Sequence, residues 1–283
     1  MAQAEKPHVD IEIAGEGECA VIFVHGGACA KEDWRFQAKE LSSRFRVITL
    51  DLPGHGKSDP PQTPTIITFA DPIVDILSAQ KNRAVLVGHS LGCRVILEAY
   101  RRAPDSVAAL IFVDGSLSAS NDDLLPLAKT KQLLREMGVD AFLNFSFRQM
   151  FVPGSDSNLV DHVVSRALHG NTAVVEAALL DAIRFDACQS AGILAQITVP
   201  VLLLQSSSID ERFQRISLSP GMRTPWTALV ARTVPHHALN IVEGVGHFPH
   251  LEAPEAINAH IVQFMEESVI GRRGAKALAA DTA

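Results

Sequence analysis

The stretch that decides the fold reads Gly88-His89-Ser90-Leu91-Gly92. It follows an apolar run at residues 84–87 and opens a helix-like run at residues 91–102. A G-x-S-x-G pattern is informative in this context of strand, sharp turn and helix. The two glycines let strand and helix approach closely, and the turn strains Ser90 so that its hydroxyl projects above the sheet. We therefore predict a nucleophilic serine at position 90.

Short apolar runs typical of buried strands alternate with helix-like segments on both sides of this stretch. The predicted strands are residues 9–13, 20–24, 46–50, 84–87, 108–113, 199–205 and 239–243. The predicted helices between and after them are residues 33–41, 70–79, 91–102, 225–234 and 254–267. Alternation of this kind predicts an α/β fold with a mostly parallel sheet covered by helices.

Residues 118–189 interrupt this alternation, because they contain no strand-like run. Helices are expected at residues 122–137, 139–150, 159–168 and 172–185, with breaks at glycine and proline. We therefore expect a core formed by residues 1–117 and 190–270 and a helical cap, or lid, formed by residues 118–189. The small and polar tail, residues 271–283, is expected to fray.

Composition excludes several classes of protein. The 283 residues carry a net charge of −7, which argues against a nucleic-acid partner because phosphate binding needs a basic face. The four cysteines show neither CxxC pairing nor zinc-ligand spacing, so neither a disulfide framework nor a metal site is expected. The chain shows no secretory signal and no apolar run long enough to span a bilayer. We expect a cytoplasmic protein that acts on a small molecule and not on a membrane, and the sequence leaves a monomer and a homodimer both open.

A serine hydroxyl at neutral pH is a poor nucleophile and needs a base. His247 follows the last predicted strand and precedes the final helix, so its loop should open at the same edge of the sheet as Ser90. We predict that His247 is the base. His25 is predicted to be structural, holding its turn through backbone hydrogen bonds, and His250 is expected at the surface.

The segment His25-Gly26-Gly27-Ala28 follows the second predicted strand. Its glycines let the main chain fold back toward Ser90. The helix that begins after Ser90 offers N–H groups and the positive end of its dipole. We therefore predict the N–H groups of Gly27 and Leu91 as the donors of an oxyanion hole.

These segments together resemble the α/β-hydrolase family. The matching residues are 25–27, 51–58, 88–92 and 246–248, in the order of the family, and the resemblance covers roughly residues 11–264. It implies an eight-stranded sheet, a cap domain and a Ser–His–acid triad. Asp51, His55 and Lys57 match a turn that is usually structural in such proteins, so we assign them no catalytic role.

The resemblance implies that the acid stands between the serine and the histidine in the chain. Asp114 ends the strand before the insert and is followed by Gly115, which allows a sharp turn. Asp210 follows the first strand after the insert, one or two residues later than the family's usual acid position. We favour Asp114 and keep Asp210 as the alternative acid.

The predicted function is that of a serine hydrolase of the carboxylesterase or lactonase type, which cleaves acyl bonds through an acyl-enzyme without a metal or an organic cofactor. The apolar insert favours a small to medium apolar substrate. Arg94 and Arg148 are expected to be solvated or ion-paired, and no basic cluster is expected to clamp a carboxylate. A C–C bond hydrolase on the same scaffold and a ligand-binding receptor with little turnover are the alternatives.

Overall fold

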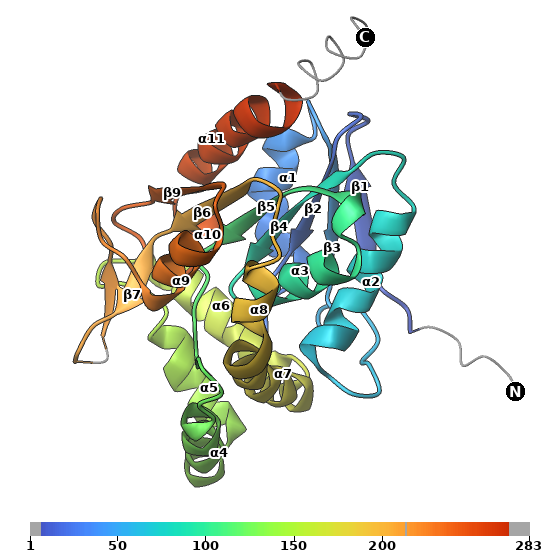
Figure 1. Cartoon of the computed structure of the whole chain (residues 1–283). Coiled ribbons are helices and arrows are strands. Elements are labelled where there is room, and N and C mark those ends of the chain that lie inside the picture. The colour runs from blue at the N-terminus through green and yellow to red at the C-terminus, as the bar shows by residue number, and fades with distance from the viewer. Residues whose placement is uncertain (1–6, 213, 272–283) are drawn as a thin grey trace, which may run out of the picture.

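The structure is a computed structural model, and it describes residues 7–212 and 214–271. Seven strands form its central sheet in the order β1-β3-β2-β4-β5-β6-β9 (Figure 1). Strand β1 pairs antiparallel with β3, and the other neighbours are parallel. The strands are β1 Ile11–Ala14, β2 Ala20–Val24, β3 Arg46–Leu50, β4 Ala84–His89, β5 Val107–Val113, β6 Val201–Gln205 and β9 His237–Ile241.

The predicted α/β fold with a mostly parallel sheet is confirmed, but the expected count of eight strands is not. The sheet formed by the described residues has seven strands. Its β1 edge holds a single antiparallel strand paired directly with β3. Strand β9 begins two residues earlier than expected, because its pairing with β6 starts with His237 opposite Val201.

Side chains of the central strands alternate between two apolar cores. On β2, Val21 and Phe23 face one core, and Ile22 and Val24 face the other. Strands buried on both faces read as near-continuous apolar runs, which explains why the sequence revealed them. Helices α1 (Arg35–Leu41) and α11 (Pro254–Phe264) cover the first face (Figure 1). The second face is covered by α2 Ile66–Ser78, α3 Leu91–Arg102, α8 Ala191–Leu194 and α9 Pro225–Thr233.

Four helices occupy the segment predicted as an insert, and Figure 1 shows them together beyond one end of the sheet. Phe147 and Phe151 belong to an apolar cluster that packs this segment against Cys29, Phe248 and Leu251, which lie outside it in the chain. The division into a core and a cap remains our proposal. The helices are α4 Leu125–Met137, α5 Val139–Arg148, α6 Ser157–His169 and α7 Thr172–Phe185.

Two predicted helix starts are wrong by more than two residues, and the local structure explains both. Helix α2 begins at Ile66 and not at residue 70, because the Thr65 hydroxyl accepts a hydrogen bond from the N–H of Thr68 at 3.2 Å. Helix α4 begins at Leu125 and not at residue 122, because Asn121 and Asp122 have positive φ angles of 54° and 58°, which a right-handed helix does not admit. Of the predicted tail, residues 271–283, only residue 271 belongs to the part of the chain that the structure describes.

A two-stranded antiparallel hairpin follows β6 and was not predicted. It consists of β7 (Ser207–Ile209) and β8 (Arg215–Ser217). These strands have three residues each and carry no apolar alternation, so they give no signal in the sequence.

None of the described helices combines the length and apolarity needed to cross a membrane. Short helical segments complete the chain: 3₁₀ turns at Lys31–Trp34 and Pro104–Ser106, π turns at Asp186–Ser190 and Met265–Ile270, and α10 at Pro249–Glu252.

The turn between β4 and α3 has the strained geometry that its sequence predicts. Ser90 adopts φ 52° and ψ −112°, a region that side-chain-bearing residues rarely occupy. A Cβ atom on Gly88 would overlap the backbone of Gly92, and a Cβ atom on Gly92 would overlap the carbonyl groups of Val24 and His25. Glycine at both positions therefore allows the close approach of strand and helix that holds Ser90 in place.

Gly92→Ala is expected to lower the free energy of unfolding by roughly 2–3 kcal/mol, because the surrounding backbone has to shift to admit a methyl group. Gly192→Ala is the matched control. Its added Cβ meets nothing within 4 Å, and alanine in helix α8 should stabilise by up to about 1 kcal/mol. Urea unfolding of both variants measures the difference. Equal stabilities for the two variants would contradict the close packing at this turn.

Candidate active site

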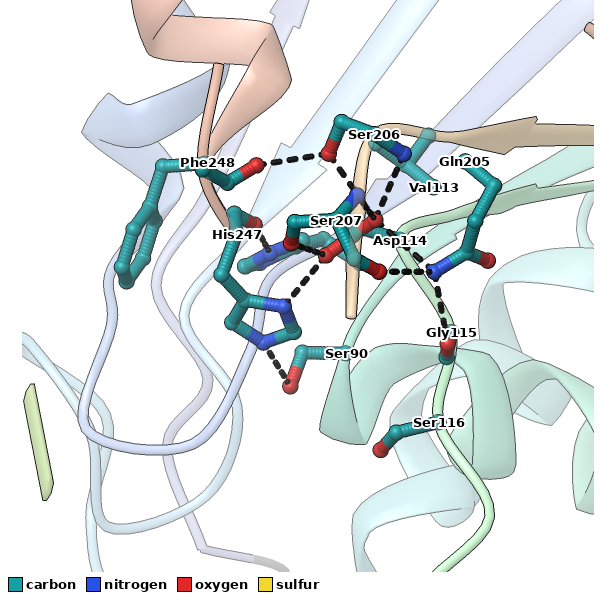
Figure 2. Close-up of polar contacts among 12 residues, drawn as sticks. Ser90, Val113, Asp114, Gly115, Ser116, Gln205, Ser206, Ser207, His247 and Phe248 are labelled. Atoms are coloured by element: carbon teal, nitrogen blue, oxygen red, sulfur yellow. Dashed lines mark hydrogen bonds and ion pairs between the residues drawn. The ribbon is translucent and has the colours of Figure 1, made fainter. Parts of the chain in front are cut away.

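Ser90 and His247 meet above the carboxyl end of the sheet. Ser90 follows β4 directly, and His247 lies in the loop between β9 and α10. The Ser90 hydroxyl donates to Nε2 of His247 at 2.9 Å (Figure 2). The predicted nucleophile and base are therefore within hydrogen-bond reach, which is the geometry that proton transfer requires.

The ring of His247 is held at both ends. Its Nδ1–H donates to Oδ2 of Asp114 at 2.6 Å, so Nε2 is free to accept from Ser90. Its backbone N–H donates to the carbonyl oxygen of Met150 at 2.8 Å. Burial lowers the pKa of His247 below its ordinary value, although Asp114 opposes this shift. The imidazole is thus neutral near pH 7 and able to act as a base.

Asp114 is buried at the end of β5 and surrounded by donors. Oδ1 accepts from Gln205 Nε2, the Ser206 N–H and the Ser206 hydroxyl, each at 2.8 Å, and from the Ser207 N–H at 3.1 Å. Oδ2 accepts from the Ser207 hydroxyl at 2.9 Å, beside its bond to His247 (Figure 2). Burial alone would raise the pKa of Asp114, but His247 and the donor from Ser206 outweigh it and lower the pKa. The carboxylate is therefore ionised.

The two candidate acids, Asp114 and Asp210, have different hydrogen-bond partners in the structure. Asp210 lies in the turn between β7 and β8, where its carboxylate accepts from the N–H groups of Arg212 and Gln214, each at 2.9 Å. The carboxylate that contacts His247 is that of Asp114.

Gly27 and Leu91 line the same cavity as Ser90. Leu91 is the first residue of α3, so its N–H has no acceptor within the helix. The role of both N–H groups as oxyanion donors remains a prediction. His25 behaves as a structural residue: its Nδ1–H donates to the Gly26 carbonyl at 2.7 Å, and its Nε2 accepts from the Leu52 N–H at 2.9 Å.

The expected surface position of His250 is wrong, because its side chain is fully buried. Its ring lies 4.5 Å from that of Trp34 and 4.4 Å from that of His89. His89 in turn donates through Nε2 to the carbonyl oxygen of His247 at 2.8 Å. Burial, and secondarily the proximity of the ionisable ring of His247, lowers the pKa of His89 to about 3, so its ring stays neutral. The sequence did not reveal this layer behind the site, which forms only when distant segments pack together.

The Asp114 cradle, by which we mean Gln205, Ser206 and Ser207, was also missed. The one signal in the sequence was the polar run that directly follows the apolar strand β6. Strand β6 runs parallel to β5. The residues at and just after the carboxyl end of β6 therefore lie next to Asp114, which follows the carboxyl end of β5. Polar residues at this point could have been read as partners of Asp114.

A cavity of about 500 Å³ opens beside Ser90 and His247. Among the described residues, no group of three or more His, Cys, Asp or Glu side chains is placed to hold a metal ion. Arg94 lines the cavity and forms an ion pair with the buried Asp186. This agrees with the prediction that Arg94 is solvated or ion-paired. Apolar side chains of the insert and of α9 form much of the cavity wall, including Phe142, Leu143, Phe147, Met150, Val175 and Trp226.

Comparisons with known proteins agree with the fold. A model described as the alpha/beta hydrolase family matches residues 21–260. The chain is 25% identical over 268 residues to a pimeloyl-[acyl-carrier protein] methyl ester esterase from Yersinia enterocolitica, covering 90% of this chain and 96% of the relative. It is 24% identical over 264 residues to the dihydrolipoyllysine-residue acetyltransferase component of the acetoin cleaving system from Pseudomonas putida, covering 90% of this chain and 66% of that protein.

The chain spans less than two thirds of the length of several curated relatives that it matches. Among solved structures, a thermophilic esterase from Thermogutta terrifontis gives a TM-score of 0.77 at 23% identity, covering 93% of this chain and 94% of the other. That likeness shows the shared fold. The family model extends from strand β2 into helix α11, so the chain belongs to the alpha/beta hydrolase family.

Proposed function

We propose that the protein is a serine hydrolase of carboxylic esters and lactones that works through an acyl-enzyme formed on Ser90. The observation that carries this proposal is the continuous chain of hydrogen bonds from Ser90 through His247 to Asp114. That chain ends at a largely apolar cavity. A serine, a histidine held in one tautomer and a buried carboxylate in this order are the components that acyl transfer requires.

In the first half of the reaction, Ser90 Oγ attacks the acyl carbon while Nε2 of His247 takes the hydroxyl proton. The carbonyl oxygen becomes an oxyanion, which accepts hydrogen bonds from the N–H groups of Gly27 and Leu91. The C–O bond to the leaving group then breaks, and His247 returns the proton to the departing alkoxide. Asp114 stays ionised and stabilises the imidazolium during these steps.

Water completes the cycle by attacking the acyl-enzyme, and His247 again takes the proton and returns it to Ser90. The products are a carboxylic acid and an alcohol, or one hydroxy acid when the substrate is a lactone. A cavity of about 500 Å³ fits a small to medium substrate. The named activity of the Yersinia relative, a methyl ester esterase, favours an oxygen ester over a C–C bond as the bond cleaved.

Ser90→Ala is expected to reduce kcat for p-nitrophenyl butyrate on the order of 10⁶-fold, because the nucleophile is lost. The hydroxyl faces a cavity, so thermal unfolding of the variant should match that of the wild type. Initial rates on purified protein measure the effect. Turnover near that of the wild type would remove Ser90 as the nucleophile and would favour a different reaction site.

Asp114→Asn is expected to reduce kcat by about 10⁴-fold, because an amide at this position no longer holds His247 in the productive tautomer. Asp210→Asn is the matched control. Its carboxylate only caps an exposed turn, so kcat should change by less than about twofold. Comparable losses in both variants would show that Asp114 is not the acid of the triad.

The pH dependence of kcat/KM should rise with pH and level off, since only neutral His247 can accept the serine proton. Burial disfavours the imidazolium and lowers the pKa of His247, so the midpoint should lie below the ordinary histidine value of about 6.5. Rates for a neutral ester between pH 4.5 and 9 test this. A midpoint above that value, or a flat profile, would exclude His247 in its present environment as the base.

A further inference from the structure

Two arginines border the cavity, and they differ in how their charge is balanced. Arg94 on α3 is buried, and its Nε and Nη2 donate to Asp186 Oδ1 and Oδ2 at 2.9 and 2.5 Å. Its Nη2 also donates to the carbonyl oxygen of Ser116 at 2.9 Å. A guanidinium paired on both sides with a buried carboxylate is neutralised and held in place. Arg94 therefore ties the insert to the helix that follows Ser90.

Arg215 is the first residue of β8 and is partly buried. Its Nε donates to the Gln149 carbonyl oxygen and its Nη1 to the Ser207 hydroxyl, both at 3.3 Å. In the part of the chain that the structure describes, no carboxylate lies within ion-pair distance of Arg215, and its Nη2 has no protein partner. Its cationic group thus borders the cavity with two long hydrogen bonds to neutral atoms.

The acidic groups that act on Arg215 from a distance are already occupied. They are Asp114 and Glu252. The Asp114 carboxylate already accepts hydrogen bonds from Gln205, Ser206 and His247. Glu252 accepts from the Ser155 hydroxyl at 2.8 Å and from the Gly246 N–H at 3.0 Å. Neither carboxylate is free to turn toward Arg215.

A partly buried guanidinium without a counter-ion is unfavourable, since burial removes water from the charge and the protein supplies no anion in return. Burial lowers the pKa of Arg215, yet a guanidinium stays protonated throughout the physiological range. The cavity thus offers one fixed positive charge beside an otherwise largely apolar wall. An anionic group on a bound molecule would supply the missing partner.

We infer that Arg215 binds a carboxylate carried by the substrate, so that the enzyme prefers esters or lactones that bear a second, ionised carboxyl group. This inference rests on the proposed function and adds a substrate class to it. The hairpin that brings Arg215 to the cavity gave no signal in the sequence.

The position of Arg215 relates this charge to the reacting atoms. Arg215 donates to Ser207, whose hydroxyl donates to Asp114, and Asp114 accepts from His247. Arg215, Ser90 and His247 also line one cavity of about 500 Å³. A carboxylate at Arg215 and an acyl carbon at Ser90 therefore fit on one small molecule, such as the monoester of a short dicarboxylic acid.

Binding to an inactive protein tests the inference without requiring turnover. Glutarate and its neutral analogue glutaramide are titrated calorimetrically into Ser90→Ala and into Ser90→Ala with Arg215→Gln. We expect the Ser90→Ala protein to bind glutarate more tightly than it binds glutaramide. Adding Arg215→Gln should weaken glutarate binding by about 10-fold or more. Arg212→Gln removes the same charge from the exposed turn of the hairpin and should leave binding unchanged.

Kinetics locate the carboxylate on the acyl or the alcohol side of the ester. The acyl arm compares p-nitrophenyl hemiglutarate with p-nitrophenyl pentanoate. The alcohol arm compares the pentanoyl ester of 4-hydroxybenzoate with that of 4-hydroxybenzamide. Arg215→Gln should lower kcat/KM for the charged member of one pair by about 10-fold more than for its neutral partner. Arg215→Lys, which keeps the charge, should restore part of the loss.

Equal losses for charged and neutral esters in Arg215→Gln would show that Arg215 supports Ser207 and Asp114 only, and would overturn the inference. Glutarate binding that does not depend on Arg215 would also overturn it. If no ester is hydrolysed by the wild type while glutarate binding still depends on Arg215, the anion site stands and the proposed reaction fails. The two claims are therefore tested separately.

Discussion

A carboxylate buried at the end of a strand is tolerated only when hydrogen-bond donors surround it, and the site depends on how Asp114 meets that constraint. Strand β6 lies beside β5, and the Asp114 N–H donates to the Leu204 carbonyl at 2.8 Å. The next residues along the chain are Gln205, Ser206 and Ser207, which therefore arrive at the Asp114 carboxylate. Sheet register thus supplies the donors that keep this charge buried and ionised.

The same cradle orients the rest of the site. The Ser206 hydroxyl lies 2.8 Å from Asp114 Oδ1 and 2.6 Å from the carbonyl oxygen of Gly246 and shares its one proton between these acceptors, so it connects Asp114 to the loop that carries His247. The loop is fixed from the other side by the insert, through the bond from the His247 N–H to Met150. A histidine held from both sides in this way has little freedom to leave Ser90. Preorganisation of this kind lowers the barrier to proton transfer.

Sequence alone predicted the parts of the fold and site that depend on local chemistry. The turn around Ser90 and the buried parallel strands follow from glycine placement and apolar runs, and the position of His247 follows from chain order. The choice between Asp114 and Asp210 stayed open, because it depends on which strand end meets the histidine loop. The burial of His250 and the Asp114 cradle arise from contacts between segments that are far apart in the chain. The hairpin that carries Arg215 is local, but its two strands are too short to give a pattern.

A structure of the protein after reaction with a small fluorophosphonate would test most directly whether Ser90, His247 and the two main-chain amides converge on one reacting atom. We expect phosphorus to be bonded to Ser90 Oγ, with its phosphoryl oxygen within hydrogen-bond distance of the N–H groups of Gly27 and Leu91. His247 should remain in contact with Asp114. Folded protein that forms no adduct, an adduct on another residue, or a phosphoryl oxygen that faces away from both amides would contradict this arrangement.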